Sequence, residues 1–414
     1  MRILFLSNLY PPNIVGGYER LCFEVASGLV SRGHEIKVLT SDYGSKIEDF
    51  PGQKVERLLK LSADEEDIYQ PFIATPEQRA AINRHNSEML SRVVEEFEPD
   101  IVFIWNLYFF DLHLLNAIKQ IKRPLVYLLT DNWLIFFLNA SFMQDYFSRH
   151  VFSKRSTFRI LSSRTRHWLT NRIKPTFQLP GHAIFASRFM CDLYTEANIG
   201  FDSKSVIYHG VNLPDRPEGD FTNRTRPLQD QEIRLLIAGR IVEIKGVHLV
   251  IEALPLILRG LSDVKLKLTL QGDDRDRAYL SRLQARISQL DLGNKVEFAK
   301  SVPEDELFKL FQTHDIYLFP SLYEPFSLTL IHALSAGIPT VASNVGGNAE
   351  IVLHMQTGLL FPSSNIQKLA ESVIKLSTNG RLRQSISEKA RKVAASYTFE
   401  NMLDKVEQLL ESIR

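Results

Sequence analysis

An acid and two cations stand at the ends of predicted strands in the second half of this chain. Glu324 follows the short apolar run 315–319 and directly precedes an apolar helix that is predicted to end at Gly337. A helix start carries unpaired N–H groups and a partial positive charge, which suits a phosphate. Glu324 can also be an ordinary first-turn acid, worth a few tenths of a kcal/mol up to about 1 against the helix dipole.

Two cations follow an earlier predicted strand, 233–238. This strand ends at Gly239, and Arg240 and Lys245 come next. Ligands bind at the carboxyl ends of strands in an open parallel sheet. A guanidinium fork and a mobile ammonium both suit phosphate oxygens. Together with Glu324 and the helix start, these groups favour a diphosphate that is joined to a hydroxyl-rich group.

The order of these motifs resembles the retaining glycosyltransferases of family 4, which have the GT-B fold. The shared motifs are a Gly-Arg…Lys-Gly turn at 239–246, a Pro-Ser-x-x-Glu segment at 320–324 and a Gly-Gly-x-x-Glu turn at 346–350. The resemblance runs from residue 2 to about residue 400 and implies two Rossmann-like, doubly wound parallel-sheet α/β domains facing a central cleft. It also implies a hexosyltransferase that moves a sugar from a nucleoside-diphosphate sugar to a hydroxyl of a glycan, lipid or small-molecule acceptor.

The motifs and the resemblance together predict the site residues. Glu324, Asp131, Arg240 and Lys245 are the predicted catalytic residues, and Glu324 is expected to accept hydrogen bonds from donor-sugar hydroxyls. The predicted donor-binding residues are Gly16, Gly17, Gly239, Arg240, Lys245, Gly272, Glu324, Pro325, Phe326, Ser327, Leu328 and His332.

Two of these positions depart from the family pattern. Ser327 stands where the family commonly has glycine, and His332 stands where it has a second glutamate. In relatives that glutamate accepts hydrogen bonds from both ribose hydroxyls, whereas a neutral imidazole offers one acceptor and one donor. One hypothesis is weaker or pH-dependent nucleotide binding through His332. The other is a buried core histidine, with the ribose bound by other groups.

The first half begins with a predicted strand–helix–strand unit. Gly16-Gly17 precedes its helix and is either a plain turn or a source of N–H groups for a phosphate or sugar; in the family this loop reaches donor and acceptor. Asp131 follows the predicted strand 124–129, in a Thr-Asp pair where many relatives have His-Asp. It could contact the sugar or acceptor, or cap the next helix.

Alternating strands and helices predict two domains with parallel sheets. We expect an acceptor-side domain at 1–212 and a donor-binding domain at 213–397, with a final helix at about 398–414 that packs back on the first, as in the family. Residues 44–98 are expected to be irregular and then helical from about 76. The strand 183–187 is expected to be the last of the first domain.

Composition narrows the class of protein. The chain has 414 residues, is 44% hydrophobic and 23% charged, and carries a formal net charge of +1, which excludes a globally basic or acidic polymer binder. Two distant cysteines, Cys22 and Cys191, provide neither a disulfide framework nor a zinc site, so we expect a cytoplasmic location. The apolar N-terminus is too short for a signal peptide, and polar residues interrupt the apolar stretch 125–142.

Residues 146–191 contain no acid but many Lys, Arg and aromatic residues. Segment 149–174 could therefore contact the inner face of a membrane or an anionic, lipid-linked acceptor, or could be a solvated basic helix pair. The basic segment could also bind nucleic acid, but nothing else in the chain supports such a partner.

No metal or other cofactor is expected. Asp274-Arg-Asp276 has the form of a metal-binding pair, but acids are favoured at a helix start in any case, and GT-B enzymes need no such motif. The alternatives are a GT-B nucleotide-sugar epimerase and a non-catalytic sugar- or lipid-binding protein. Arg240, Lys245 and Glu324 argue against the second of these.

Overall fold

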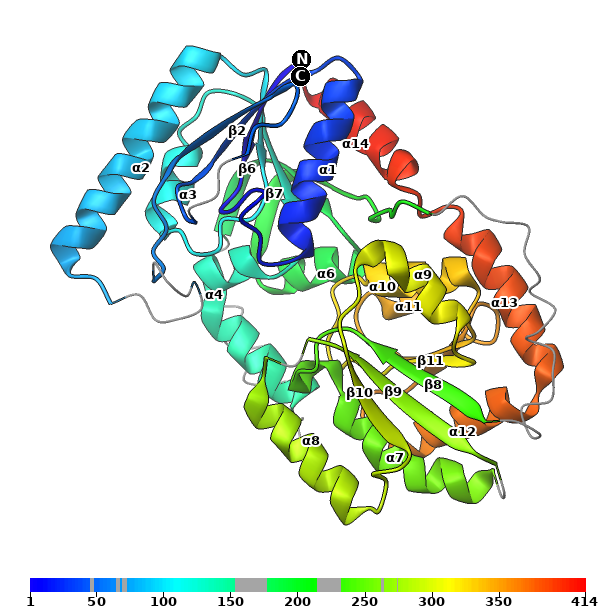
Figure 1. Ribbon diagram of the computed structural model, residues 1–414. Helices are drawn as coiled ribbons and strands as arrows, with labels where there is room; N and C mark the ends of the chain where they lie inside the picture. The colour runs from blue at the N-terminus through cyan, green and yellow to red at the C-terminus, as the bar shows by residue number, and fades with distance from the viewer. Residues whose placement is uncertain are drawn as a thin grey trace. The chain divides into compact units, whose positions relative to one another are not determined.

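The computed structural model describes residues 1–44, 48–64, 68, 73–152, 177–213, 232–261, 264–273 and 275–414. It divides into two compact units, each with one parallel sheet (Figure 1). Unit 1 consists of Met1–Ile207 and Leu403–Arg414, and unit 2 consists of Tyr208–Met402.

The sheet of unit 1 has seven strands in the order β3-β2-β1-β4-β5-β6-β7, and every neighbouring pair is parallel. The strands are β1 (Arg2–Leu6), β2 (Glu35–Ser41), β3 (Gln53–Leu59), β4 (Ile101–Ile104), β5 (Leu125–Leu129), β6 (Phe177–Phe185) and β7 (Ile199–Val206). The helices are α1 (Gly17–Ser31), α2 (Pro76–Phe97), α3 (Leu112–Ile118), α4 (Trp133–Tyr146), the short η1 (Phe147–Val151) and α6 (Arg188–Glu196).

The sheet of unit 2 has six parallel strands in the order β10-β9-β8-β11-β12-β13. The strands are β8 (Ile233–Ala238), β9 (Leu266–Gly272), β10 (Val296–Lys300), β11 (Ile316–Phe319), β12 (Thr340–Ser343) and β13 (Leu359–Phe361). The helices are η4 (Glu243–Lys245), α7 (Val247–Gly260), α8 (Arg277–Gln289), α9 (Glu304–Gln312), α10 (Leu328–Ala336), α11 (Asn348–Ile351), α12 (Ile366–Thr378) and α13 (Gly380–Ala394).

Burial explains why the central strands form where the sequence predicts them. All residues of β4, β5, β11 and β12 are buried, as are four of the five residues of β1. Strands covered by helices on both faces become continuous apolar runs of this kind. The two parallel, doubly wound sheets confirm the predicted α/β fold class.

The strand order fixes where a ligand can bind. In each sheet the chain first builds outward on one side and then returns to the centre, so β4 lies beside β1 and β11 lies beside β8. The strands on either side of such a reversal send their following loops in opposite directions, which opens a ligand site at their carboxyl ends. In unit 2 this point is the β8–β11 pair.

Two edge strands correct the sequence prediction. The segment expected to be irregular after residue 44 contains β3, and β7 follows β6 although 183–187 was predicted to be the last strand. Both lie at sheet edges, where they have a neighbour on one side only. Their sequences are rich in charged and polar residues, and only one residue of each is buried, so a search for apolar runs misses them.

The last helix, α14 (Phe399–Ile413), lies along α1 in unit 1 (Figure 1). Glu407 on α14 accepts hydrogen bonds from Arg32 Nη1 at 2.6 Å and from His34 Nε2 at 2.7 Å. Leu403 packs against Gly28, where an added Cβ would lie 2.5 Å from the leucine Cδ2. The last helix therefore packs on α1 and on the turn that leads from α1 to β2.

Candidate functional site

A partly buried ion pair lies at the β8–β11 reversal of unit 2. Lys245 Nζ donates to Glu324 Oε2 at 2.5 Å, and Ser321 Oγ donates to the same oxygen at 3.3 Å. The Glu324 side chain is 9% exposed and that of Lys245 is 21% exposed. The ammonium also lies 5.4 Å from the centre of the Phe319 ring. The structure therefore brings together two predicted catalytic residues that are 79 positions apart.

Backbone contacts hold the loops that carry this pair. The Leu322 N–H donates to the Ile244 carbonyl at 2.8 Å, which joins the loop after β11 to the turn after β8. The Gly347 N–H donates to the Glu324 carbonyl at 2.9 Å. At Gly346, φ is +50° and an added Cβ would lie 1.9 Å from the same carbonyl oxygen. Only glycine fits there, which explains the Gly-Gly turn after β12.

The ends of β8 and β9 meet at two further predicted residues. The Gly239 N–H donates to the Gln271 carbonyl at 2.9 Å, and an added Cβ on Gly272 would lie 1.7 Å from the Gly239 oxygen. Arg240 follows Gly239 and is exposed. Its charge helps to lower the pKa of Asp273, after the larger effect of the hydrogen bond from Arg275. A cation thus stands just after β8, at the same carboxyl edge of the sheet that carries the Lys245–Glu324 pair.

The start of α10 has the geometry of an anion-binding helix end. Ser327 is its N-cap, and its Oγ accepts a hydrogen bond from the Leu330 N–H at 3.2 Å. This cap gives the serine at position 327 a structural role. Because the first N–H groups of a helix lack intrahelical acceptors, those of Leu328 and Thr329 are left for a phosphate. Pro325 and Phe326 are half-buried just before the cap.

His332 lies in the second turn of α10 and is buried. Its Nε2 forms a hydrogen bond of 2.9 Å with Oε1 of Glu304, which is the first residue of α9. Glu304 was not among the predicted site residues. It lies 28 positions before His332, and its pairing depends on the packing of α9 against α10, which the sequence pattern does not reveal.

An aromatic cluster behind Phe326 was also missed. Tyr208 stacks on Phe326 with ring centres 5.7 Å apart, and Tyr397 lies 6.2 Å away. Tyr208 Oη donates to Glu350 Oε2 at 3.0 Å, which binds the Gly-Gly-x-x-Glu turn to this cluster. Burial lowers the pKa of the neighbouring His209 to about 4, so its ring stays neutral at physiological pH. The only sequence signal was the aromatic pair Tyr208-His209 where unit 2 begins.

The unit 1 candidates lie at the carboxyl edge of their own sheet. Gly16 is the N-cap of α1, and its N–H donates to Glu19 Oε2 at 2.9 Å. A carboxylate therefore already occupies one N–H group of the Gly16-Gly17 turn. An added Cβ on Gly17 would have open space around it, so this glycine is not required by packing.

Asp131 lies at the end of β5 and accepts a hydrogen bond from the Trp133 N–H at 3.0 Å. Burial raises the pKa of the Asp131 carboxyl to about 6; the Trp133 bond opposes this shift, and the charge of Glu19 adds to it. Burial likewise raises the pKa of Glu19. Two carboxyl groups with raised pKa values therefore lie close together beside the predicted Gly-Gly turn.

The Asp131→Asn variant tests whether the pKa of Asp131 is raised in the native state. Because the native pKa of about 6 lies above the ordinary value of about 3.9, the native state binds more protons than the unfolded state between these pH values. Stability is therefore lost as pH rises through this window, and the loss persists above it. We expect the variant to be about 1–3 kcal/mol more stable than the wild type at pH 7 and equal to it below about pH 4.

Unfolding by urea at several pH values measures this difference. The control is Asp145→Asn, which alters a carboxylate on α4 that is 64% exposed and should leave the pH dependence unchanged. If the free energy of unfolding depends on pH in the same way for the wild type and for Asp131→Asn, then burial does not raise the pKa of Asp131.

Two further features of the described residues concern a metal site and a membrane-spanning helix. In the part of the chain that the structure describes, no three His, Cys, Asp or Glu side chains gather closely enough to hold a metal ion. Likewise, none of the helices within the described ranges is long and apolar enough to cross a membrane. Asp274 and most of the basic segment, 153–176, lie outside the described residues.

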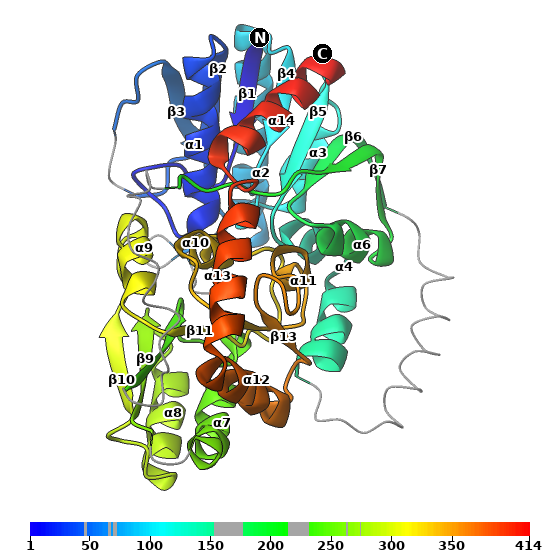
Figure 2. The same cartoon turned by 90° about the vertical axis from the view of Figure 1, so that its right-hand side faces the viewer.

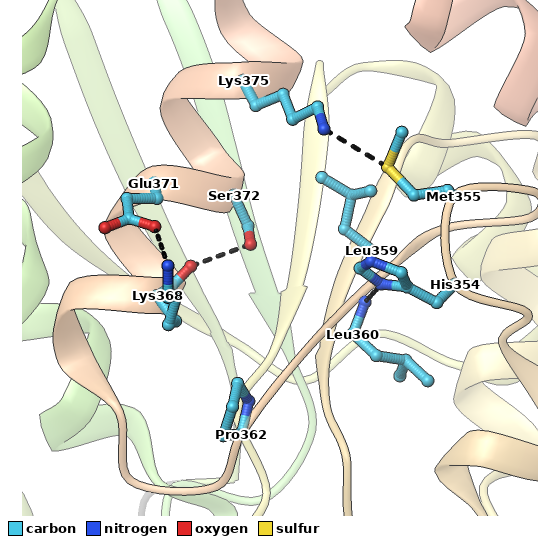
Figure 3. Close-up of a pocket in the computed structure, with 9 residues that line it drawn as sticks. All are labelled: His354, Met355, Leu359, Leu360, Pro362, Lys368, Glu371, Ser372 and Lys375. Carbon is cyan, nitrogen blue, oxygen red and sulfur yellow. Dashed lines mark hydrogen bonds and ion pairs between the residues drawn. The ribbon is translucent and has the colours of Figure 1, made fainter.

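A surface pocket of about 320 Å³ lies between β13 and α12 (Figure 3). Its lysines already have partners, because Lys368 Nζ donates to Glu371 at 2.7 Å and Lys375 Nζ donates to Met355 Sδ at 3.5 Å. None of the residues predicted as site residues lines this pocket. This pocket is therefore separate from the predicted site residues.

Comparison with known families matches both halves of the chain. Residues 220–393 match the family described as glycosyl transferases group 1, and residues 15–214 match the family described as glycosyltransferase family 4. Among similar proteins, an uncharacterized glycosyltransferase of Methanocaldococcus jannaschii is 28% identical over 97% of this chain and 96% of its own length. The glycogen synthase of Mycobacterium tuberculosis is 25% identical, with coverage of 90% and 85%.

Solved structures share the whole fold. Sucrose-phosphate synthase from Thermosynechococcus elongatus has a TM-score of 0.73 and 19% identity, and the alignment covers 100% of this chain and 98% of that chain. HepE from Anabaena, solved in complex with UDP-glucose, has a TM-score of 0.66 and 20% identity, with both chains fully covered. These similarities confirm the predicted GT-B fold.

Proposed function

The chain belongs to the group 1 and family 4 glycosyltransferases and is a GT-B transferase, and from this premise we propose its donor, stereochemistry and site. It takes a sugar from a nucleoside-diphosphate sugar and transfers it to a hydroxyl acceptor with retention of the anomeric configuration. The observation that carries this proposal is the Lys245–Glu324 ion pair at the β8–β11 reversal, beside the start of α10.

The ion pair would exchange partners when the donor binds. Lys245, exposed Arg240 and the first N–H groups of α10 are suited to diphosphate oxygens, while the Glu324 carboxylate is suited to sugar hydroxyls. Because the pair is already assembled by the backbone contacts of three loops, these groups need little rearrangement. Such preorganised charges stabilise a transition state more than water does.

The reaction breaks the bond between the anomeric carbon and the diphosphate oxygen, and the bonding electrons leave with the diphosphate. The acceptor oxygen forms the new bond to the anomeric carbon on the same face, and its proton passes to the departing phosphate. Negative charge therefore grows next to Lys245 and Arg240 during the step. Groups that bind this charge more strongly in the transition state raise the rate.

The donor is proposed as a UDP-sugar in the first instance, because the structurally similar HepE was solved with UDP-glucose. We propose that transfer needs no metal, since the cations suited to the diphosphate are side chains. The acceptor is a glycan, a lipid or a small molecule. A cytoplasmic location and a membrane contact through 149–174 remain part of the proposal.

Thermal unfolding with UDP, GDP, ADP, CMP and their sugars tests donor binding. A ligand at about 100 times its dissociation constant adds roughly 2.7 kcal/mol of stability. We expect one nucleotide family to raise the melting temperature equally with and without EDTA, and the Arg240→Ala variant to lose that rise. Arg381→Ala, an exposed arginine on α13, is the matched control and should retain it.

Three experimental results would contradict parts of the proposal. If no nucleotide stabilises the wild type, the proposed donor site is wrong. If stabilisation requires a divalent cation, the proposal that no metal is needed is wrong. Turnover of the donor without an acceptor would instead favour the epimerase alternative.

A further inference from the structure

We infer that Glu304 supplies the carboxylate that binds the ribose hydroxyls of the donor nucleotide, and that His332 positions it. This inference rests on the proposed donor site and adds to it a residue on α9 that no motif had indicated.

The geometry of the pair assigns the two roles. His332 Nε2 and Glu304 Oε1 are 2.9 Å apart, and because a carboxylate only accepts, the imidazole donates. The His332 side chain is 6% exposed, whereas that of Glu304 is 37% exposed. The buried ring therefore holds one carboxylate oxygen, while the acid itself remains accessible to a ligand. Since Nε2 is engaged in this bond, the imidazole is poorly suited to replace a ribose-binding carboxylate.

The position of the pair matches the length of a nucleotide. His332 lies five residues after Ser327, the N-cap of α10. At about 1.5 Å per residue, this places it about 7–8 Å along the helix from the proposed diphosphate site. A ribose joined to the diphosphate through its 5′ carbon spans a comparable distance. Figure 2 shows α9 beside α10, and Glu304 reaches His332 from the first residue of α9.

The Glu304 carboxylate is also chemically suited to the hydroxyls of a ribose. A ribose presents two neighbouring hydroxyl donors, and a carboxylate presents two acceptor oxygens. In related parallel-sheet folds that bind nucleotides, an acidic residue commonly accepts a hydrogen bond from a ribose hydroxyl. The negative charge of Glu304 is tolerated because it lies at the N-terminal end of a helix.

The test compares UDP with 2′-deoxy-UDP, by calorimetric titration of the full chain. The wild type should bind UDP more tightly than its deoxy counterpart. Glu304→Ala should weaken UDP binding by about 10- to 100-fold, as expected for the loss of hydrogen bonds to a charged group, and should bind the two nucleotides nearly equally. Glu306→Ala, which removes an exposed acid from the same helix, should behave as the wild type does. If the donor panel selects GDP or ADP, its ribose and deoxyribose forms replace the uridine pair.

His332 variants test the positioning role. His332→Ala should reduce the preference for ribose, and His332→Gln should restore part of it, because a glutamine amide can donate to Glu304. In the Glu304→Ala background, His332→Ala should have little further effect on the ribose preference. Melting temperatures of the variants without ligand show whether each one is folded.

The nucleotide titrations distinguish a failure of the Glu304 role from a failure of the proposed donor site. A wild type that binds no nucleotide refutes both. A wild type that binds UDP, together with a Glu304→Ala variant of unchanged affinity and unchanged ribose preference, overturns the role of Glu304 and leaves the donor site intact.

Discussion

Replacing Lys245 with alanine should nearly abolish sugar transfer. The variant loses the cation that faces the departing diphosphate, and removal of one such preorganised group typically lowers the rate about 100- to 1,000-fold. Because Lys245 donates to the buried Glu324 at 2.5 Å, the variant also leaves a carboxylate buried with one hydroxyl donor, Ser321, at 3.3 Å. We therefore expect a loss of stability as well, of about 1–3 kcal/mol.

A double variant separates these two effects. Glu324→Gln removes the charge that Lys245 compensates, so Lys245→Ala combined with Glu324→Gln should recover much of the lost stability. It should not recover activity, because neither the phosphate cation nor the sugar-binding carboxylate is present. The measurements are melting temperatures and initial rates of transfer from the donor that the nucleotide panel selects.

Lys309→Ala is the matched control for Lys245. Lys309 is an exposed lysine near the end of α9, so its removal should leave both stability and rate close to those of the wild type. A Lys245→Ala enzyme that transfers sugar at a normal rate would show that the ion pair is structural only.

The sequence predicts the parts of this protein that local chemistry determines. The central strands are continuous apolar runs, and the glycines, Arg240, Lys245 and Glu324 follow strand ends, so both the fold class and the site edge could be predicted. The edge strand β3 (Gln53–Leu59) mixes polar, charged and apolar residues without a regular alternation and has only one buried residue. It could not be recognised from its own composition.

The missed site features depend on packing between distant segments. His332 gains its meaning from Glu304, which another helix brings within 2.9 Å. The pKa of Asp131 rises because of burial and the charge of Glu19, which precedes it by more than a hundred residues. Ser327 is different: as an N-cap it follows a local rule, so its role could have been interpreted from the sequence alone.

Gly272→Ala should be the most damaging change that adds only one methyl group. The new Cβ would lie 1.7 Å from the Gly239 carbonyl oxygen, which belongs to the backbone and has no side-chain freedom with which to move aside. The ends of β8 and β9 must therefore separate, against the hydrogen bond from Gly239 N–H to Gln271 at 2.9 Å. We expect a stability loss of about 1–3 kcal/mol or more.

This variant should also weaken nucleotide binding, because Arg240 directly follows the displaced Gly239. The matched control is Gly293→Ala: an added Cβ at Gly293 meets nothing within 4 Å, so its stability should stay within about 1 kcal/mol of the wild type. Denaturant unfolding and nucleotide titration of both variants provide the comparison. If Gly272→Ala matches Gly293→Ala in stability and nucleotide affinity, then the β8–β9 end is pliable. In that case the close contact between these strands does not position Arg240, and the donor site must rely on the Lys245–Glu324 loops alone.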